Sequence, residues 1–528
     1  MREMKDSGVE WIGKIPKDWE IVPLTKQLDS IVDYRGKTPE KTEEGTFLVT
    51  AKNIKDGKIC YELSKEYVRE ADYEEIMHRG IPQIGDILFT TEAPLGQVAN
   101  VDRTDIALAQ RIIKFRALST VNNYYLKYWM LNEGFQQFLH SLSTGSTATG
   151  IKSSKLFLLP LVRPNIEQQN KIVEYLEDYL THHGGYTKGD PKKFNRESGL
   201  EEDTFVEFIK TSQPKKWERY VKIYAENSEK QIIERFKREV KTTNLLNVMR
   251  HGFMDRGIKF YPIFWKPETS LNETTQMQYD ANILHCTRQL HYSVHNENSI
   301  DIVLFANGIP VVSMELKCQF TGQDTTNAIN QYKFDRAGKD AIFAFKERVL
   351  VHFAVDLTNV YMTTRLEGAH TYFLPFNQGS NGAGKVGGKG NPVNPNGYDT
   401  AYLWERVLCK DSLMEILQKY MHLQQEYDKN GNLVKETMIF PRYHQLDVVT
   451  KLLEDVKKNG SGKSYLIQHS AGSGKSNSIA WLAHRLTGLH DYEDNKIFQS
   501  VIIVTDRRVL DSQLQSTVYQ FDLSLIHI

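Results

Sequence analysis

The sequence predicts a multidomain protein of the α/β class, and three observations support this. With 528 residues the chain is too long for one hydrophobic core, which suggests three or four domains. Strand-like runs rich in β-branched and aromatic residues alternate with segments whose apolar residues recur at helical spacing. The sequence also changes character abruptly near residues 175–180. We therefore expect three domains, formed by residues 1–175, 176–425 and 426–528.

The overall composition is ordinary for a globular protein, with 40% hydrophobic and 25% charged residues. No run of eighteen apolar residues occurs and the N-terminus lacks an apolar signal core, so we expect a cytoplasmic protein. The formal net charge is zero, so any DNA binding must use local basic patches. The four cysteines are widely separated, which argues against a disulfide framework or a zinc site.

The first domain begins with short strand-like runs at residues 45–50, 85–90 and 111–118, separated by Gly and Pro turns. Apolar residues at helical spacing follow over residues 121–142 and again over 164–180. A polar loop rich in Gly, Ser and Thr lies between these two helical patterns. This order predicts a mixed α/β domain.

The segments WIGKIPKDWEIVPL, GDILFT, IKSSKLFLLPLVRP and EQQNKIVEYL resemble a target recognition domain of a type I restriction specificity subunit. That subunit normally carries two such domains, whereas this chain has one. The resemblance implies contact with double-stranded DNA through basic side chains on phosphates and amide side chains on base edges. The residues we expect to make these contacts, each with an ordinary solvated surface role as the alternative, are Arg35, Lys37, Lys52, Asn53, Gln110, Arg111, Lys152 and Lys155.

In the second domain, residues 299–317 place charged groups on two strongly apolar runs, with the hairpin signal Asn307-Gly308 between them. Glu315 and Lys317 are two residues apart on one strand and therefore share a face. Two carboxylates, Asp301 and Glu315, can hold Mg²⁺ through oxygen, and an ammonium can steady the attacking water or the phosphate. The alternative is a structural ion pair, because charged groups on such strands must be paired or bind a metal.

This D…ExK pattern resembles the PD-(D/E)xK nucleases, and the segments RHGFMDRGIKF, RQLHYSVHNENS, ELKCQFTGQ and AINQYKFDR resemble the motor subunit of type I restriction enzymes. The resemblance implies that Asp301, Glu315 and Lys317 are catalytic, with Mg²⁺ held by the two carboxylates. It also places a helix-borne catalytic glutamine at Gln331, although the tyrosine expected four positions later is replaced by Asp335. The implied partners are the methyltransferase and specificity subunits of a type I complex.

In the third domain, SYLIQ, HSAGSGKS and NSIAWLAHRL predict a buried strand, a glycine-containing loop and a helix. In this context the backbone N–H groups of a loop containing Gly472 and Gly474 cradle phosphates, Lys475 reaches the β and γ oxygens, and Ser476 holds Mg²⁺. A strict motif has glycine where this chain has His469. An earlier GSGKS at residues 460–464 follows a helix, so we interpret it as a decoy.

Arg442 and Gln445 match the element of superfamily 2 helicases that contacts adenine, so the resemblance implies ATP and the start of a RecA-like lobe. It also implies phosphate contacts of DNA at Arg507 and Arg508, with ordinary solvated surface charge as the alternative. The acidic Walker B pair and the second lobe of such motors do not occur before residue 528, so we expect ATP binding without hydrolysis by this chain.

Together these features predict a type I site-specific deoxyribonuclease, in which Mg²⁺-dependent cleavage of double-stranded DNA is coupled to ATP-dependent translocation and a DNA recognition domain is fused at the N-terminus. The alternative is a non-catalytic DNA-binding or assembly fragment of a restriction complex.

Overall fold

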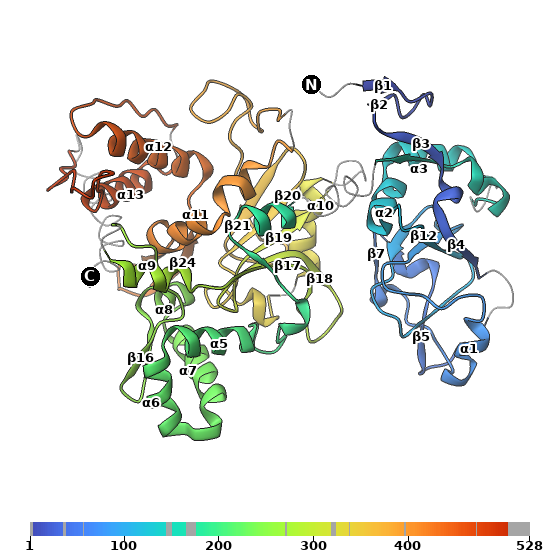
Figure 1. Ribbon diagram of the computed structural model, residues 1–528, viewed down its shortest axis with the longest axis horizontal. Helices are drawn as coiled ribbons and strands as arrows, with labels where there is room; N and C mark the ends of the chain where they lie inside the picture. The colour runs from blue at the N-terminus through green and yellow to red at the C-terminus, as the bar shows by residue number, and fades with distance from the viewer. Residues whose placement is uncertain are drawn as a thin grey trace. The chain divides into compact units, whose positions relative to one another are not determined.

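The computed structural model describes residues 4–34, 39–55, 57–143, 150–164, 176–269, 272–317, 324–336, 338–394, 398–470 and 472–504. The chain divides into two compact units. The N-terminal unit is Met1–Asp178 together with two short segments, and the C-terminal unit contains the remaining residues from Tyr179 onward. Each unit is described by itself below (Figure 1).

The N-terminal unit is built on a four-stranded antiparallel sheet in the order β10-β9-β12-β4 and a three-stranded sheet in the order β11-β5-β8. The predicted strands at 45–50, 85–90 and 111–118 are confirmed as β5, β9 and β12. The strands of this unit are β1 (Met4–Asp6), β2 (Lys14–Pro16), β3 (Glu20–Pro23), β4 (Leu28–Asp33), β5 (Thr46–Val49), β6 (Ile54–Lys55), β7 (Lys58–Ile59), β8 (Tyr67–Val68), β9 (Ile87–Thr90), β10 (Val98–Asn100), β11 (Ile106–Leu108), β12 (Ile112–Ala117) and β13 (Pro160–Arg163).

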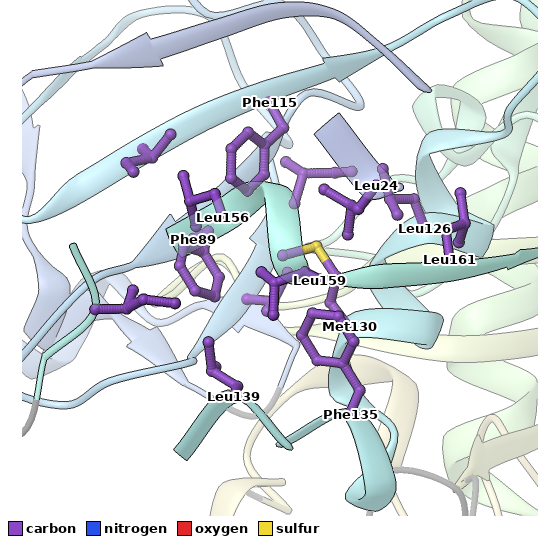
Figure 2. Close-up of a cluster of buried hydrophobic side chains, with 14 of the residues drawn as sticks. Leu24, Phe89, Phe115, Leu126, Met130, Phe135, Leu139, Leu156, Leu159 and Leu161 are labelled. Carbon is purple, nitrogen blue, oxygen red and sulfur yellow. The ribbon is translucent and has the colours of Figure 1, made fainter. Parts of the chain in front are cut away.

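The main core of this unit forms where the four-stranded sheet meets two helices, α2 (Asn123–Leu131) and α3 (Glu133–Ser141) (Figure 2). The sequence pattern at 121–142 predicted continuous helical spacing, but Asn132 ends α2 and begins α3, its side chain accepting a hydrogen bond from the Phe135 N–H at 3.3 Å. Asparagine favours this capping role because its side-chain oxygen satisfies an otherwise unpaired helical N–H. The unit also contains the short helix α1 (Tyr73–Ile76). Residues 176–182 are helical, and the division between the two units falls within this segment, after Asp178.

The C-terminal unit is organised around a seven-stranded mixed sheet in the order β14-β17-β18-β19-β20-β21-β22. β17, β18 and β19 are antiparallel neighbours, whereas β19 and β20 run parallel. Every residue of β18 is buried, which explains its nearly continuous apolar sequence. The strands are β14 (Thr187–Lys188), β15 (Phe253–Asp255), β16 (Ile258–Phe260), β17 (Leu284–His291), β18 (Ser299–Ala306), β19 (Ile309–Leu316), β20 (Val351–Val355), β21 (Val360–Thr363), β22 (Leu374–Pro375), β23 (His422–Tyr427) and β24 (Leu433–Ile439).

Helices surround this sheet, and α6 and α7 project beyond it as a separate lobe (Figure 1). The helix α10 continues directly into the π-helical turn η9 (Gln331–Asp335). Residues 377–394 contain no helix or strand. The helices are α5 (Glu202–Ser212), α6 (Pro214–Tyr224), α7 (Ser228–Thr242), α8 (Leu245–His251), α9 (Glu273–Asp280), α10 (Thr325–Asn330), α11 (Lys410–Glu415), α12 (Tyr443–Asn459) and α13 (Lys475–Thr487).

The predicted hairpin at Asn307-Gly308 joins β18 to β19. Both turn residues have positive φ angles, +52° and +79°, which is the conformation of a type I′ turn. The turn is packed tightly, because a Cβ atom at Gly308 would lie 2.4 Å from the Glu201 backbone oxygen. Glycine is therefore required here for its backbone freedom and for its lack of a side chain.

We expect Gly308→Ala to lower the free energy of unfolding of the C-terminal unit by about 3 kcal/mol or more, because it adds a steric clash to left-handed backbone strain. The matched control is Gly257→Ala. Gly257 has a similar φ of +76°, but its Cβ would meet nothing within 4 Å, so this change should cost only about 1 kcal/mol. Urea unfolding of both variants measures the difference, and equal losses would contradict the close approach at Gly308.

The prediction that SYLIQ (residues 464–468) forms a buried strand is wrong. Residues 464–468 form no strand, and Leu466 is 93% exposed. A strand needs neighbours for its backbone hydrogen bonds, and no strand among the described residues pairs with this segment. Residues 501–504 form no strand either. In the part of the chain that the structure describes, no helix is long and apolar enough to cross a membrane.

Candidate functional site

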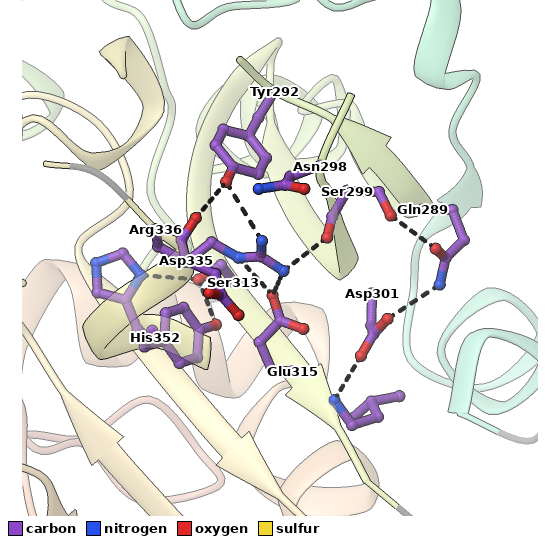
Figure 3. Close-up of polar contacts among 12 residues, drawn as sticks. Gln289, Tyr292, Asn298, Ser299, Asp301, Ser313, Glu315, Asp335, Arg336 and His352 are labelled. Atoms are coloured by element: carbon purple, nitrogen blue, oxygen red, sulfur yellow. Dashed lines mark hydrogen bonds and ion pairs between the residues drawn. The ribbon is translucent and has the colours of Figure 1, made fainter. Parts of the chain in front are cut away.

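The two predicted carboxylates lie opposite each other on neighbouring strands. Ile302 of β18 pairs with Met314 of β19, and one step further along this register places Asp301 opposite Glu315. Asp301 is 9% exposed and Glu315 is fully buried. Opposed residues of antiparallel strands project from the same face. The two side chains are therefore cross-strand neighbours (Figure 3).

A register shift in the hairpin is what brings these carboxylates to one face. Next to the turn, Phe305 pairs with Pro310, but Leu304 pairs with Val312, so β19 contains one extra residue at this point. Without that β-bulge, Asp301 would oppose Met314, and Glu315 would project from the other face. The bulge thus creates the acidic pair.

Asp301 accepts hydrogen bonds at both of its carboxylate oxygens. Its Oδ2 atom accepts from the Leu316 backbone N–H at 2.9 Å, and its Oδ1 atom accepts from Gln289 Nε2 at 3.0 Å. Gln289 Oε1 in turn accepts from the Ser299 hydroxyl at 2.9 Å. A carboxylate oxygen can accept more than one hydrogen bond or ligand, so these contacts orient Asp301 without exhausting its acceptor capacity.

Glu315 is paired with Arg336, a residue that the sequence analysis did not single out. The Arg336 Nε and Nη2 atoms donate to Glu315 Oε1 at 3.0 and 2.6 Å, and Nη2 also donates to the Ser299 carbonyl oxygen at 2.8 Å (Figure 3). Burial alone would lower the pKa of Arg336, but the Glu315 charge raises it overall. Arg336 is the last residue of the segment AINQYKFDR, which resembles the motor subunit. Its position in that segment was the sequence signal that could have identified it as a site residue.

The α10–η9 helix contacts the face of β19 that bears Glu315. The Ser313 hydroxyl lies 2.8 Å from the Tyr332 hydroxyl and 2.7 Å from His352 Nδ1, and Ser313 shares a strand face with Glu315. Burial lowers the pKa of His352 to about 3, so this imidazole is neutral at neutral pH and serves as a hydrogen-bonding group. This network fixes the helix that carries Gln331 and Arg336.

Gln331 begins the π-helical turn, and its buried Oε1 atom accepts no hydrogen bond from the described residues. A π-helical turn contains one residue more than an α-helical turn. The residue one turn after Gln331 is therefore five positions away, at Arg336, instead of four positions away, at Asp335. The polar side chain that this end of the helix contributes to the site is therefore Arg336, the residue after Asp335.

Lys317 follows the last residue of β19 and is half-buried. Its backbone N–H donates to the Val355 carbonyl oxygen at 2.8 Å, which extends the pairing between β19 and β20. Because strand side chains alternate, Lys317 projects from the same face as Glu315. The structure therefore places Asp301, Glu315 and Lys317 on one side of the hairpin.

The donor set fits a hard divalent cation better than zinc. Among the described residues, no group of three or more His, Cys, Asp and Glu side chains gathers to enclose a metal. Mg²⁺ typically uses one or two protein carboxylates and completes its shell with water and phosphate oxygens. Asp301 and Glu315 supply that number of carboxylates, with Glu315 Oε1 already held by Arg336.

The predicted phosphate loop leads directly into the helix α13. Gly472 and Gly474 have positive φ angles, +73° and +80°, and Lys475 begins α13. The Lys475 ammonium donates to the carbonyl oxygens of His469 and Ser470 at 3.2 and 3.1 Å. The lysine thus lies folded over the loop, where its charge is available to a phosphate.

Gln445 connects the helix α12 to this loop. Its Nε2 atom donates to the Gly474 carbonyl oxygen at 2.8 Å, and its Oε1 atom accepts from the Arg442 backbone N–H at 2.9 Å. A Cβ atom at Gly474 would lie 2.4 Å from Gln445 Nε2, so only glycine allows this approach. Gln445 is buried and fixes the position of the loop relative to α12.

Four of the six predicted nucleotide-binding residues line one cavity of about 850 Å³. These residues are Arg442, Gln445, Gly472 and Gly474. The opposite walls come from β24 and from residues 362–365, at the end of β21 in the central sheet. The volume is within the range of small-molecule sites.

The residues predicted to contact DNA from the N-terminal unit have different surroundings. Lys52 and Lys152 are exposed, and Gln110 is half-buried. Arg111 pairs with Glu92 at 3.0 Å, and the Lys155 ammonium donates to the Leu142 carbonyl oxygen at 2.7 Å. The remaining predicted DNA contacts, which lie outside the described residues, are Arg35, Lys37, Arg507 and Arg508.

Asn53 has a structural role in place of the predicted base contact. Its side chain is fully buried. The Oδ1 atom accepts from the Thr50 N–H and hydroxyl at 2.9 and 2.8 Å, and Nδ2 donates to the Cys60 and Ser64 carbonyl oxygens at 3.1 and 2.8 Å. All its hydrogen-bonding capacity is used to hold a turn, so the expectation that this side chain reads a base is wrong.

Comparison with known families gives three matches in chain order. Residues 16–193 match the type I restriction modification DNA specificity domain, residues 168–371 match the N terminus of the type I restriction enzyme R protein, and residues 444–525 match the SWI2/SNF2 ATPase. The resemblance to specificity and motor subunits of type I restriction enzymes is therefore confirmed.

Individual relatives match parts of the chain. A putative type I restriction enzyme MjaVIIIP endonuclease subunit of Methanocaldococcus jannaschii is 24% identical over 53% of this chain and 25% of its own length. The MjaVIII specificity subunit of the same organism is 27% identical over 31% of this chain and 40% of its own length. A crystal structure of the HsdS subunit from Thermoanaerobacter tengcongensis matches with 19% identity and a TM-score of 0.23, over 34% of this chain and 40% of that one. The chain thus spans less than half of each protein.

Proposed function

We propose that this chain, which joins a segment similar to type I specificity subunits to a segment similar to the start of type I endonuclease subunits, is a restriction polypeptide that cleaves double-stranded DNA with Mg²⁺. The observation that carries the proposal is the bulged hairpin. It places Asp301 and Glu315 opposite each other, with Lys317 on the same face, inside the region that matches the R protein N terminus.

In this proposal Asp301 and Glu315 hold the metal and Lys317 stabilises charge that develops on the phosphate. Bound Mg²⁺ would polarise the phosphate and favour ionisation of an attacking water. Arg336 orients the Glu315 carboxylate through their buried ion pair, in which Arg336 Nη2 lies 2.6 Å from Glu315 Oε1. Gln331, whose buried Oε1 atom lies in the helix that covers this face, contacts the phosphate or Lys317.

The C-terminal segment is proposed to bind ATP as the first part of a RecA-like lobe that drives translocation. Arg442 and Gln445 would contact the base, and the loop with Lys475 would cradle the phosphates. Ser476 would hold the Mg²⁺ that accompanies ATP. The match to the SWI2/SNF2 ATPase model and the 850 Å³ cavity support this part.

The N-terminal unit is proposed to contact double-stranded DNA through its exposed basic side chains, Lys52 and Lys152 among them. Its match to the DNA specificity domain supports this role and supports assembly with methyltransferase and specificity subunits. The three proposed domains keep the boundaries 1–175, 176–425 and 426–528.

The buried Glu315–Arg336 ion pair favours one alternative, in which the acidic pair is structural and the chain binds DNA without cutting it. A plasmid assay separates the two functions. Supercoiled DNA is incubated with the chain, with ATP and with methyltransferase and specificity subunits, in Mg²⁺ or in EDTA, and retention of DNA on a filter is measured in parallel. We expect cleavage in Mg²⁺ and none in EDTA. Retention without cleavage in Mg²⁺ would support the alternative and reject the proposal.

A further inference from the structure

A second cavity, of about 600 Å³, lies in the C-terminal unit where α5 meets α6. Its walls include Gln213, Lys215 and Lys216 from the junction of these helices, and Tyr261 and Trp265 from the segment that follows β16. The cavity thus combines ammonium groups with large aromatic side chains. None of these residues belongs to the proposed nuclease or nucleotide sites.

Two lysines lie against the ring of Tyr261, although only Lys216 of the two lines the cavity itself. The Lys216 ammonium is 4.7 Å from the centre of the Tyr261 ring, and the Lys259 ammonium is 5.3 Å from the same centre. Burial, followed by the neighbouring charge of Lys259, lowers the pKa of Lys216. Within the described parts of the chain, no ion pair links Lys215, Lys216 or Lys259 to a carboxylate. The fold therefore holds like charges together without an acidic counter-charge.

A buried side chain, Gln213, fixes the residues that line the cavity. Gln213 is 6% exposed; its Nε2 atom donates to the Tyr261 carbonyl oxygen at 2.9 Å, and its Oε1 atom accepts from the Tyr261 N–H at 3.0 Å. The same Oε1 atom accepts from the Lys216 ammonium at 3.3 Å. Arg250 also lines the cavity, but its guanidinium donates to the carbonyl oxygens of Leu417 and Met421. The ring and the two lysines are thus positioned before any ligand binds.

An anion explains this arrangement. Two ammonium groups near one another repel unless a negative charge lies between them, and a cation–π contact offsets only about 0.5–1 kcal/mol at an exposed site. The N-terminus of the eleven-residue helix α6 adds partial positive charge at the same place. Lysine ammonium groups are among the usual protein contacts to the backbone phosphates of duplex DNA.

We propose that this cavity binds a backbone phosphate of the DNA substrate, at a site separate from the cleavage site. The identification of the ligand as DNA rests on the proposed function; the anion site itself rests on the lysines and the cavity. Asn307, at the far end of β18 from Asp301, donates to the Pro262 carbonyl oxygen at 2.9 Å. Six residues of strand correspond to about 20 Å. The two sites could therefore contact one duplex about six base pairs apart.

The test compares two double variants of the full chain that each lose two positive charges from the same unit. Lys216→Gln/Lys259→Gln removes the pair at the cavity, and Lys230→Gln/Lys241→Gln removes two exposed lysines of α7. Binding of a fluorescent 30-base-pair duplex is measured without divalent metal, at several salt concentrations. We expect the cavity variant to bind the duplex about tenfold more weakly, and the slope of log K against log salt concentration to be smaller by about two. The affinity of the α7 variant should change by less than about twofold.

Equal effects of the two pairs, or no effect of the cavity pair, would overturn the proposal. Because Lys216 also bonds to Gln213, the single variant of the exposed Lys259 is measured as well, and we expect it to weaken binding about threefold without changing the unfolding temperature. Inorganic phosphate and a single-stranded oligonucleotide are each tested as competitors of the bound duplex. Their effects distinguish an isolated anion site, a single-strand site and a duplex site. Displacement of the duplex by phosphate alone would reject a DNA site. DNA binding that depends on the lysines, without any Mg²⁺-dependent cleavage, would reject the proposed function and leave this proposal standing.

Discussion

Replacing Lys475 by alanine is expected to weaken ATP binding by roughly 10- to 100-fold, because the phosphates lose a charge-assisted contact of about 1.5–3 kcal/mol. Lys475 begins α13 and lies over the loop that Gln445 fixes. The N-terminus of this helix and the loop N–H groups remain in the variant, so some affinity should remain. Binding of a fluorescent ATP analogue to the full chain measures the effect.

The chain supplies its own control for this experiment. The pentapeptide GSGKS occurs twice, at residues 460–464 and 472–476. The first copy follows the C-terminus of α12, and its Lys463 lies 3.3 Å from Asp455 on the surface. Lys463→Ala should therefore leave ATP affinity unchanged. If the two alanine variants behaved alike, the assignment of the second copy as the phosphate loop would be wrong.

The features of this protein that depend on residues close together in the sequence could be predicted from the sequence. The Asn307-Gly308 turn, the helices α12 and α13 and the alternation that places Glu315 and Lys317 on one face all follow from short-range patterns. The bulge in β19 could not be predicted in this way. A regular two-residue hairpin would have placed Asp301 opposite Met314, so the sequence contained the right residues without indicating their register.

Contacts between segments that are distant in the sequence could not be predicted from sequence patterns either. Arg336 is 21 residues from Glu315 and is aligned with it by a π-helical turn that no local signal announces. Asn53 looks like an exposed polar residue in sequence, but its amide is consumed by a turn. SYLIQ has the composition of a buried strand, yet a strand forms only where partner strands are present, and the described chain provides none for it.

Replacing Glu315 by glutamine is expected to reduce Mg²⁺-dependent DNA cleavage on the order of a thousandfold, since a metal ligand and its charge are lost together. The same change leaves the buried Arg336 guanidinium without its charged partner, which should also cost about 3–5 kcal/mol of stability. Lost activity alone would therefore not separate a metal ligand from a structural ion pair. Glu226→Gln, which alters an exposed carboxylate elsewhere in the same unit, controls for the loss of one negative charge.

Two further variants separate these roles. Asp301→Asn removes the opposing carboxylate, which accepts from Leu316 and Gln289. The Glu315–Arg336 ion pair stays intact in this variant, so it should abolish cleavage with a small change in unfolding free energy. Glu315→Gln/Arg336→Gln removes both members of the ion pair and should recover most of the stability lost in Glu315→Gln, because no uncompensated buried charge remains. If Glu315 binds the metal, the stabilised double variant still fails to cut DNA. If the ion pair is only structural, the double variant regains cleavage together with stability, and the assignment of Glu315 as a metal ligand must be abandoned.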